Sequence, residues 1–501
     1  MAYRKELTSG LPRVMAILWF LNIAFIAGNT VLQKSIAPFG LAGNANWNAA
    51  LLIITTIWSL YLLSTAKWEG TFAKAYFFFI CGLLLITGGW SFLRCNSRAA
   101  LLALCAAGLL AAYLEYGYKY RKACLTALLA GITGLAVFAT IPAGNRILTE
   151  RIAEDVRIPL WEGCIKLIGD NWMTGTAPSL FESEFAPYVP EDYFMRDNAA
   201  VRCNHPHNHF LFFAAAFGML LFPLWAFLLL CPLFVFFRTY REKNTLDKLI
   251  FYSFLILLIH SMLDLVLYEW PTNVIGLMLL GLLWGMTIKT DEKITDMEPG
   301  RMLRHAGAVL GVIFAFYLII ELKNDFMASA NYRNALIFSK APQGGQSAAF
   351  YFDKALDYKG SSPKILYKAA MNAFHKLNNP DMALSYLRRI SADSPARNYA
   401  HGNGFIGLIL CRKGQLKEGL KYLDAESENY PLSTTVRYYQ FAAHQQLGEK
   451  AAAEDAYAKM LGTLKLKGLS LRDLPEVLEN PDYDSHPRKL LEKRAENGTK
   501  E

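Results

Sequence analysis

Residues 204–218 read NHPHNHFLFFAAAFG, in which three histidines stand at alternate positions directly ahead of a long apolar run. An apolar run of about 17 or more residues is long enough to cross a bilayer as a helix. About nine such runs occur before residue 322, and they begin near Val14, Trp47, Ala75, Ala99, Ala123, His209, Leu249, Asn273 and His305. The sequence therefore predicts an all-α fold that starts with a polytopic bundle of about nine membrane spans.

The Lys and Arg residues in the short connections predict the orientation of these spans. With the N-terminus in the cytoplasm, the cytoplasmic connections hold most basic residues, and the outer short connections hold only Lys34, Arg94 and Arg98. This orientation places the long connection 142–208 and the C-terminal part of the chain outside the cytoplasm. The formal net charge of +9 then follows from topology and gives no reason to expect nucleic-acid binding.

The composition becomes polar from residue 323 onward, which predicts a membrane domain at 1–322 and a second domain at 323–501. Three stretches of the second domain align at spacings of 36 and 34 residues: HKLNNPDMALSYLRRI (375–390), RKGQLKEGLKYLDAE (412–426) and QLGEKAAAEDAYAKM (446–460). This period resembles that of tetratricopeptide repeats and implies a soluble α-solenoid with a surface for a peptide or protein partner. A generic helical domain is the alternative interpretation.

The histidine stretch has three interpretations. Alternating histidines share one side of an extended segment and could bind a metal ion such as zinc, although Pro206 and the following helix interrupt the extension. The histidines could also be polar residues at the end of an interfacial helix. In the third interpretation His207 is a general base, a role that suits histidine near neutral pH.

Four motifs support the third interpretation. In chain order they are GLAGNANWNAALL (40–52), SRAALLALCAA (97–107), RIPLWEGCIKLI (157–168) and HNHFLFFAAAFGMLL (207–221). Together they resemble the O-antigen ligase and polymerase superfamily of bacterial membrane glycosyltransferases. In the last motif Gly218 keeps the family register, whereas Leu221 stands where a second glycine is expected and would prevent one close helix approach.

The resemblance implies a reaction on the extracytoplasmic side of the bacterial inner membrane. A glycan would pass from a polyprenyl-diphosphate-linked donor to a hydroxyl group of a lipid, a glycan or a protein. His207 would accept the proton, and Arg98 and Arg157 would neutralise the departing diphosphate, because guanidinium groups bind phosphate oxygens in pairs. The residues implied to bind substrate are Arg151, Asn208, Trp161, Asn44 and Asn46. With arginines at the diphosphate, neither a metal ion nor a cofactor is expected.

Several of these residues also have a structural interpretation. Arg98 could snorkel at the end of a span, and Trp161 could anchor a surface helix at the interface. Asp264, between two predicted spans, is either a second base or a helix-end carboxylate. For the whole protein, the main alternative is a non-enzymatic membrane scaffold for surface-polysaccharide assembly. A polysaccharide exporter fits less well, because the predicted spans are nearly uncharged.

Overall fold

The computed structural model describes residues 2–33, 39–117, 126, 155–178, 180–190, 193, 205–287, 298–391, 399–479 and 490. All regular elements within these residues are helices, which confirms the predicted all-α class. The span predicted near Ala123 and the predicted site residue Arg151 lie outside the described residues.

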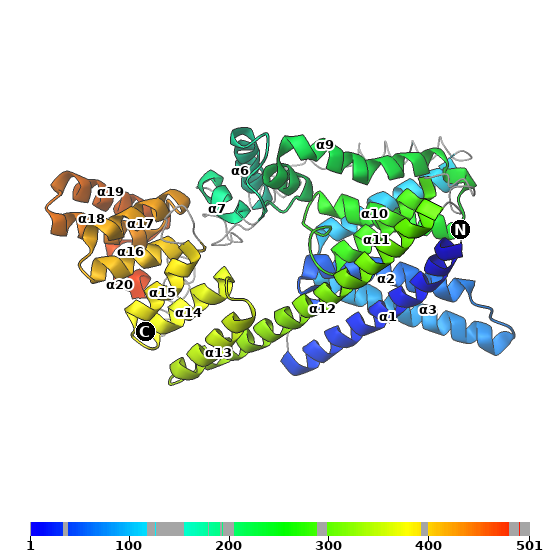
Figure 1. The fold of residues 1–501 in the computed structure, drawn as a ribbon, viewed down its shortest axis with the longest axis horizontal. Helices are drawn as coiled ribbons and strands as arrows, with labels where there is room; N and C mark the ends of the chain where they lie inside the picture. Colours follow the sequence, from blue (N-terminus) through cyan, green and yellow to red (C-terminus); the bar gives the residue numbers. More distant parts are fainter. Residues whose placement is uncertain are drawn as a thin grey trace. The chain divides into compact units, whose positions relative to one another are not determined.

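The chain divides into two compact units (Figure 1). The first unit comprises Met1–Pro178 and His205–Lys289, and the second comprises Ser179–Asn204 and Thr290–Glu501. The long connection 142–208 is therefore shared between the two units. The domain boundary predicted at residue 322 falls inside α12 (Glu298–Lys340), which is one continuous helix.

Five helices within the described part of the first unit are long and apolar enough to cross a membrane. They are α1 (Ala2–Gln33, apolar over Gly10–Gly28), α2 (Ala45–Thr65), α3 (Thr71–Cys95), the helix Arg98–Gly117 and α9 (His209–Arg238). Two predicted spans are shorter helices, namely α10 (Thr245–Ser261) and α11 (Thr272–Thr287). By length and composition these five helices are candidate membrane spans, and the predicted number of about nine spans stays a prediction.

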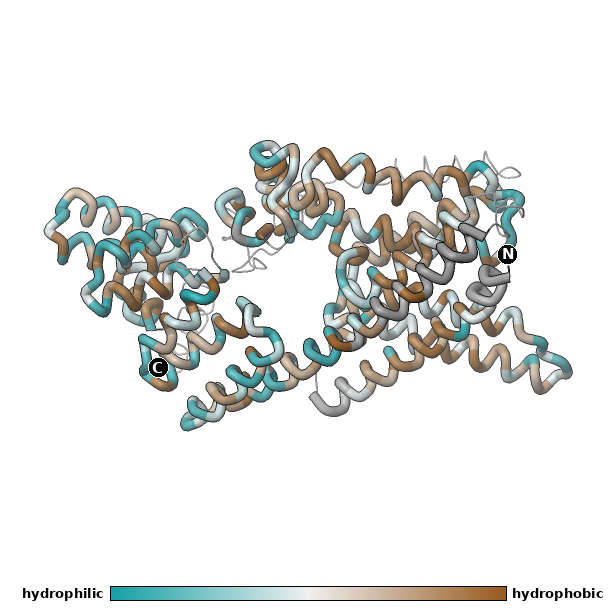
Figure 2. Tube along the Cα trace, in the orientation of Figure 1, coloured by the Kyte–Doolittle hydropathy of each residue, from teal (hydrophilic) through white to brown (hydrophobic). Residues whose placement is uncertain are grey.

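Helix α2 lies at the centre of the first unit, between α1 and α3, and also contacts α10 and α11. Its Trp58 is fully buried and donates its indole N–H to Ser253 of α10 at 2.8 Å. In contrast, α3 exposes large apolar side chains such as Phe72, Phe78 and Ile86. An exposed apolar surface of this kind suits contact with lipid tails, and hydrophobic residues follow these helices along their length (Figure 2).

The second unit consists mainly of consecutive helix pairs. After α12 come α13 (Gly345–Tyr358), α14 (Pro363–His375), α15 (Pro380–Ser391), α16 (Gly402–Arg412), α17 (Leu416–Asn429), α18 (Thr434–Leu447), α19 (Lys450–Leu466), η5 (Leu471–Asp473) and α20 (Leu474–Glu479). Helix α12 pairs with α13, α14 with α15, α16 with α17 and α18 with α19.

The turns of the last three pairs share one backbone conformation. Asn378, Gly414 and Gly448 have positive φ angles of 49°, 78° and 76°, and they are 36 and 34 residues apart. Asparagine and glycine adopt this left-handed conformation most readily, so the sequence period corresponds to a repeated turn. Whether the pairs form a tetratricopeptide-type solenoid stays a prediction.

Candidate functional site

His207 lies in a tight turn that ends where α9 begins. Its φ is 50°, a left-handed conformation that costs a residue with a side chain roughly 1–2 kcal/mol. The backbone N–H of His207 donates to Nδ1 of His205 at 3.3 Å. Asn208 then caps α9, because its side-chain oxygen accepts the N–H groups of Phe210 and Leu211 at 2.9 and 3.0 Å. Strained backbone held in this way is frequent at functional sites.

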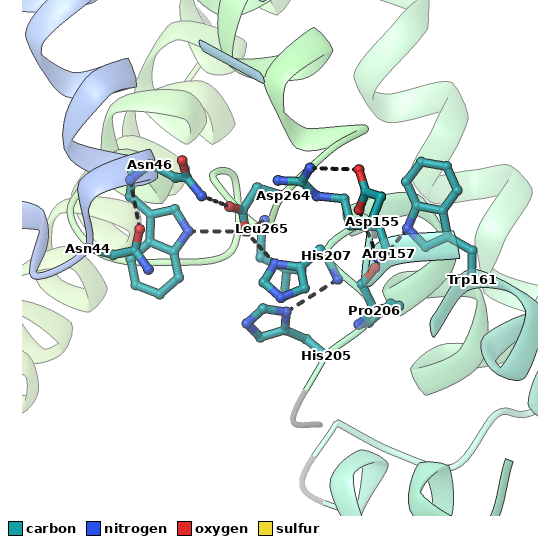
Figure 3. Close-up of polar contacts among 11 residues, drawn as sticks. Asn44, Asn46, Asp155, Arg157, Trp161, His205, Pro206, His207, Asp264 and Leu265 are labelled. Carbon is teal, nitrogen blue, oxygen red and sulfur yellow. Dashed lines mark hydrogen bonds and ion pairs between the residues drawn. The ribbon is translucent and has the colours of Figure 1, made fainter. Parts of the chain in front are cut away.

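Asp264 is the centre of the polar contacts around His207 (Figure 3). It is buried, with 1% of its surface exposed, in the turn between α10 and α11. One carboxylate oxygen, Oδ1, lies 3.4 Å from Nδ1 of His207, which is an ion-pair distance without hydrogen-bond geometry. The same oxygen accepts the backbone N–H of Leu265 at 2.8 Å, and Oδ2 accepts the side-chain N–H of Asn46 at 3.0 Å.

These contacts keep Asp264 ionised. Burial alone would raise the pKa of this carboxyl group, because a charge is poorly solvated in the interior. The adjacent His207 and the N–H group of Leu265 outweigh burial and lower the pKa of Asp264 below its usual range. A buried carboxylate beside an imidazole can orient the ring and stabilise its protonated form.

The Gly-Asn-x-Asn motif supplies part of this arrangement. Asn46 donates to Asp264, and Trp47 donates its indole N–H to the same carboxylate at 3.4 Å. Asn44 caps α2 by accepting the N–H of Asn46 at 2.8 Å. Asn44 and Asn46 thus have contacts within the protein, and their predicted binding of substrate stays a prediction, as does that of Asn208.

Arg157 begins α6 (Arg157–Asp170) in the long connection. Its guanidinium lies 3.6 Å from the carboxylate of Asp155, and its backbone N–H donates to the same residue at 2.9 Å. Arg157 and Asp264 both interact electrostatically with His260 of α10. The structure therefore brings Arg157 into the neighbourhood of the His207 and Asp264 cluster (Figure 3).

Trp161 connects α6 to the histidine turn. Its indole N–H donates to the carbonyl oxygen of Pro206 at 2.8 Å. The predicted role of Trp161 was substrate binding, and the structure adds a contact that fixes the residue preceding His207. One turn later Cys164 is fully buried, with its sulfur 3.6 Å from the carbonyl oxygen of Leu211.

Arg98 occupies a different position from the other predicted site residues. It begins its helix after Ser97, whose hydroxyl accepts the N–H of Ala100 at 3.3 Å. The Arg98 side chain is exposed, and within the described ranges no hydrogen bond or ion pair joins it to Asp264 or His207. Its proposed contact is thus with a ligand and not with the cluster.

The three histidine rings are not arranged around one point at which a metal ion could bind. The rings of His205 and His207 meet edge to face at 4.3 Å, whereas His209 is buried and packs on Trp225 at 5.1 Å. Across the part of the chain that the structure describes, no group of three or more His, Cys, Asp or Glu residues is arranged to hold a metal ion.

Helix α9 reverses its direction at Gly218. This glycine has φ 75° and ψ 167°, outside the helical range. The rings of Phe213 and Trp225 stack at 4.3 Å, although these residues would be about 18 Å apart along a straight helix. The chain thus folds back, and residues 219–238 alone form about 30 Å of apolar helix, the thickness of a hydrocarbon core.

A segment that follows α6, residues 172–177, completes the hydrogen bonds at this reversal; we call it the clasp. The carbonyls of Trp172 and Met173 accept the N–H groups of residues 219 and 220 at 2.7 and 3.3 Å. In the opposite direction, Thr176 and Ala177 donate to the carbonyls of residues 215 and 216 at 3.0 and 2.9 Å. Two backbone groups at each helix end of the reversal are thereby paired with one passing segment.

Two glycines make this approach possible. A Cβ atom on Gly218 would lie 2.2 Å from the carbonyl oxygen of Met173, and one on Gly175 would lie 2.6 Å from the carbonyl oxygen of Ala215. The close approach therefore occurs at Gly218 and Gly175. Leu221 is 47% exposed, so in place of the expected glycine it points away from a tight contact.

Two features of the site were not predicted from the sequence. For Asp264 the sequence left two roles open, a second base or a helix-end carboxylate. Its position between two apolar helices is the feature that could have indicated a functional role. Gly175 had no signal of its own, because its partner Gly218 lies in another motif.

Comparison with known proteins supports the superfamily that the sequence motifs resemble. Residues 82–226 match the family model described as O-Antigen ligase. No curated protein matches the sequence. The match supports the O-antigen ligase superfamily and, at the family level, a membrane glycosyltransferase-like ligase. Together with the apolar helices it indicates a multi-pass bacterial membrane protein, consistent with lipid-linked glycan substrates.

Proposed function

We propose that this protein transfers or polymerises a glycan from a polyprenyl-diphosphate-linked donor onto an acceptor hydroxyl at the extracytoplasmic side of the bacterial inner membrane. The observation that carries the proposal is the cluster of His207, Asp264 and Arg157, formed by three separate segments. The cluster joins a base, its orienting carboxylate and a guanidinium. A lipid, a glycan or a protein hydroxyl can take part in the same chemistry.

His207 acts as the general base in this proposal. With Nδ1 facing the carboxylate of Asp264, the tautomer that carries its proton on Nδ1 leaves Nε2 as an acceptor. Nε2 takes the proton from the acceptor hydroxyl while the oxygen of that hydroxyl attacks the anomeric carbon of the glycan. The Nδ1–Oδ1 distance of 3.4 Å shortens as the imidazolium forms, since such contacts often tighten only with substrate bound.

Arg157 acts on the leaving group. As the bond between the anomeric carbon and the phosphate oxygen breaks, the electron pair stays on the lipid diphosphate, which gains negative charge. A guanidinium stays charged in this environment and binds phosphate oxygens with two N–H groups. Asp155 holds the Arg157 side chain while the site is empty of donor, and Arg98 and Arg151 contribute further positive charge in the proposal.

The test is glycan transfer in cells that lack the native gene and carry full-length variants. His207→Ala and Arg157→Ala are expected to reduce transfer by at least about 100-fold, the range for loss of a general base or a transition-state charge contact. His444→Ala and Arg94→Ala are matched controls on exposed or partly exposed positions and are expected to keep wild-type transfer. Normal transfer by both site variants would overturn the mechanism and favour a membrane scaffold.

A further inference from the structure

The outer connection 142–208 belongs to both units. Its α6 and the clasp lie in the first unit, whereas the following segment, Ser179–Asn204, belongs to the second. Within this segment the structure describes α7 (Phe181–Phe185) and η2 (Ala186–Tyr188). The turn η2 packs against α17 of the helix pairs. Part of the long connection is thus a docked element of the C-terminal unit.

The burial of this segment exceeds what it can achieve alone. Phe181 and Phe185 are 1% and 0% exposed and stack at 5.0 Å, and Val189 and Tyr193 are 6% and 2% exposed. These four residues recur every fourth position. A single helical turn of five residues has neither the length nor the area to be stable in water or to bury four large side chains. Their burial therefore requires a larger surface, and the contact of η2 with α17 shows that the helix pairs supply part of it.

The docked segment is closely tied to the proposed site. Ala177, the last residue of the clasp, is bonded to Ala216 of α9, and only residues 178–180 separate it from Phe181. Three residues span about 10 Å when extended. A displacement of the docked segment that exceeds this maximum length therefore also displaces the clasp. The clasp follows α6, the helix that begins with Arg157.

We infer that the helix pairs of the second unit bind residues 180–190 of their own chain, and that this docking restrains the outer loop and thereby Arg157. The second part of the inference rests on the proposed function, whereas the docking does not. The occupant of this surface of the unit is therefore the loop of the same molecule. A foreign peptide would have to compete with it.

The test is hydrogen–deuterium exchange on the full-length protein in lipid nanodiscs, with Phe185→Asp as the perturbing variant. A charge at this buried position opens the docked segment. We expect amide exchange at least about tenfold faster both in 180–190 and in α17, because the two surfaces protect each other, with α13 unchanged. Glu184→Ala, at an exposed position of α7, is the control and is expected to leave both peptides unchanged.

Each outcome decides one part of the inference. Faster exchange in 180–190 with no change in α17 would overturn the docking. Faster exchange in both peptides with wild-type glycan transfer would overturn the restraint on Arg157, which predicts at least a roughly threefold loss of kcat. If wild-type protein itself shows no glycan transfer, the proposed function fails, and the exchange data still decide the docking.

Discussion

Replacing Gly218 by alanine tests the reversal of α9 and the clasp that completes it. The native conformation, φ 75° and ψ 167°, belongs to a region that is essentially restricted to glycine, so an alanine there costs about 1–3 kcal/mol. The new Cβ would also lie 2.2 Å from the carbonyl oxygen of Met173, a backbone atom with little freedom to move. Overpacking of this kind costs a further 1–3 kcal/mol or so. We therefore expect a total destabilisation of about 2–6 kcal/mol.

Cys164 provides a local probe for this measurement. Burial raises the pKa of this thiol to about 12, and its sulfur faces the first turn of α9, so it is unreactive while α6 and α9 stay packed. Thiol labelling during heating, in a variant that keeps Cys164 as the sole cysteine, reports when this packing opens. Gly218→Ala is expected to lower the temperature of half-maximal labelling by at least about 4 °C.

The control is Gly285→Ala in α11, where an added Cβ meets open space and the helical backbone tolerates alanine. This change is expected to be neutral or to stabilise the protein by up to about 1 kcal/mol. Gly175→Ala, on the opposite side of the same contact, should behave like Gly218→Ala. If Gly218→Ala labels at the same temperature as Gly285→Ala, the close approach at the reversal is not the feature that stabilises the site.

Three further changes act on the site itself. Asp264→Asn keeps the size and removes the charge beside His207, so glycan transfer should fall about 10²–10⁴-fold at an unchanged labelling temperature; a loss below threefold would refute the orienting role. Trp161→Phe removes only the N–H that Pro206 accepts, and a roughly 3–10-fold loss of kcat is expected in transfer assays, whereas a change confined to KM would contradict positioning. Burial and the charge of His207 lower the pKa of His205 to about 4, below its value of about 6.5 in the unfolded chain. The contribution of His205 to stability is therefore complete above about pH 6.5 and is lost as pH falls toward 4. His205→Asn keeps an acceptor for the N–H of His207, so its free energy of unfolding, measured with denaturant, should fall less between pH 6.5 and 4 than that of wild type. An equal fall in the two proteins would contradict this role of His205.

Membrane helices were the most predictable part of the fold. The apolar runs near Val14, Trp47, Ala75 and Ala99 each correspond to a long helix, because hydrophobic length is a local property of the sequence. The run at His209 shows the limit of this reasoning. Its composition is apolar throughout, yet the chain reverses inside it, because the reversal depends on backbone contacts with residues 172–177.

The residues of the candidate site could be chosen from the sequence, whereas the contacts among them could not. The motifs singled out His207, Arg157 and Asn46, and the structure places these in one region. The role of Asp264 depends on how α10 and α11 pack against α2, which no local pattern encodes. The N-cap contact of Asn44 could be predicted from the sequence, because an asparagine one residue ahead of a helix is a frequent N-cap.

The clasp also has a consequence for the order in which the protein is made and inserted. Residues 172–177 leave the ribosome before α9, and they accept the N–H groups of Met219 and Leu220. An N–H group without a partner is costly in a lipid environment. If the connection that carries the clasp is translocated, as the proposed orientation requires, α9 can fold back only after the clasp has crossed the membrane, and until then a straight helix would satisfy the same N–H groups. Assembly of the His207 turn would then be a late step that follows translocation of the loop.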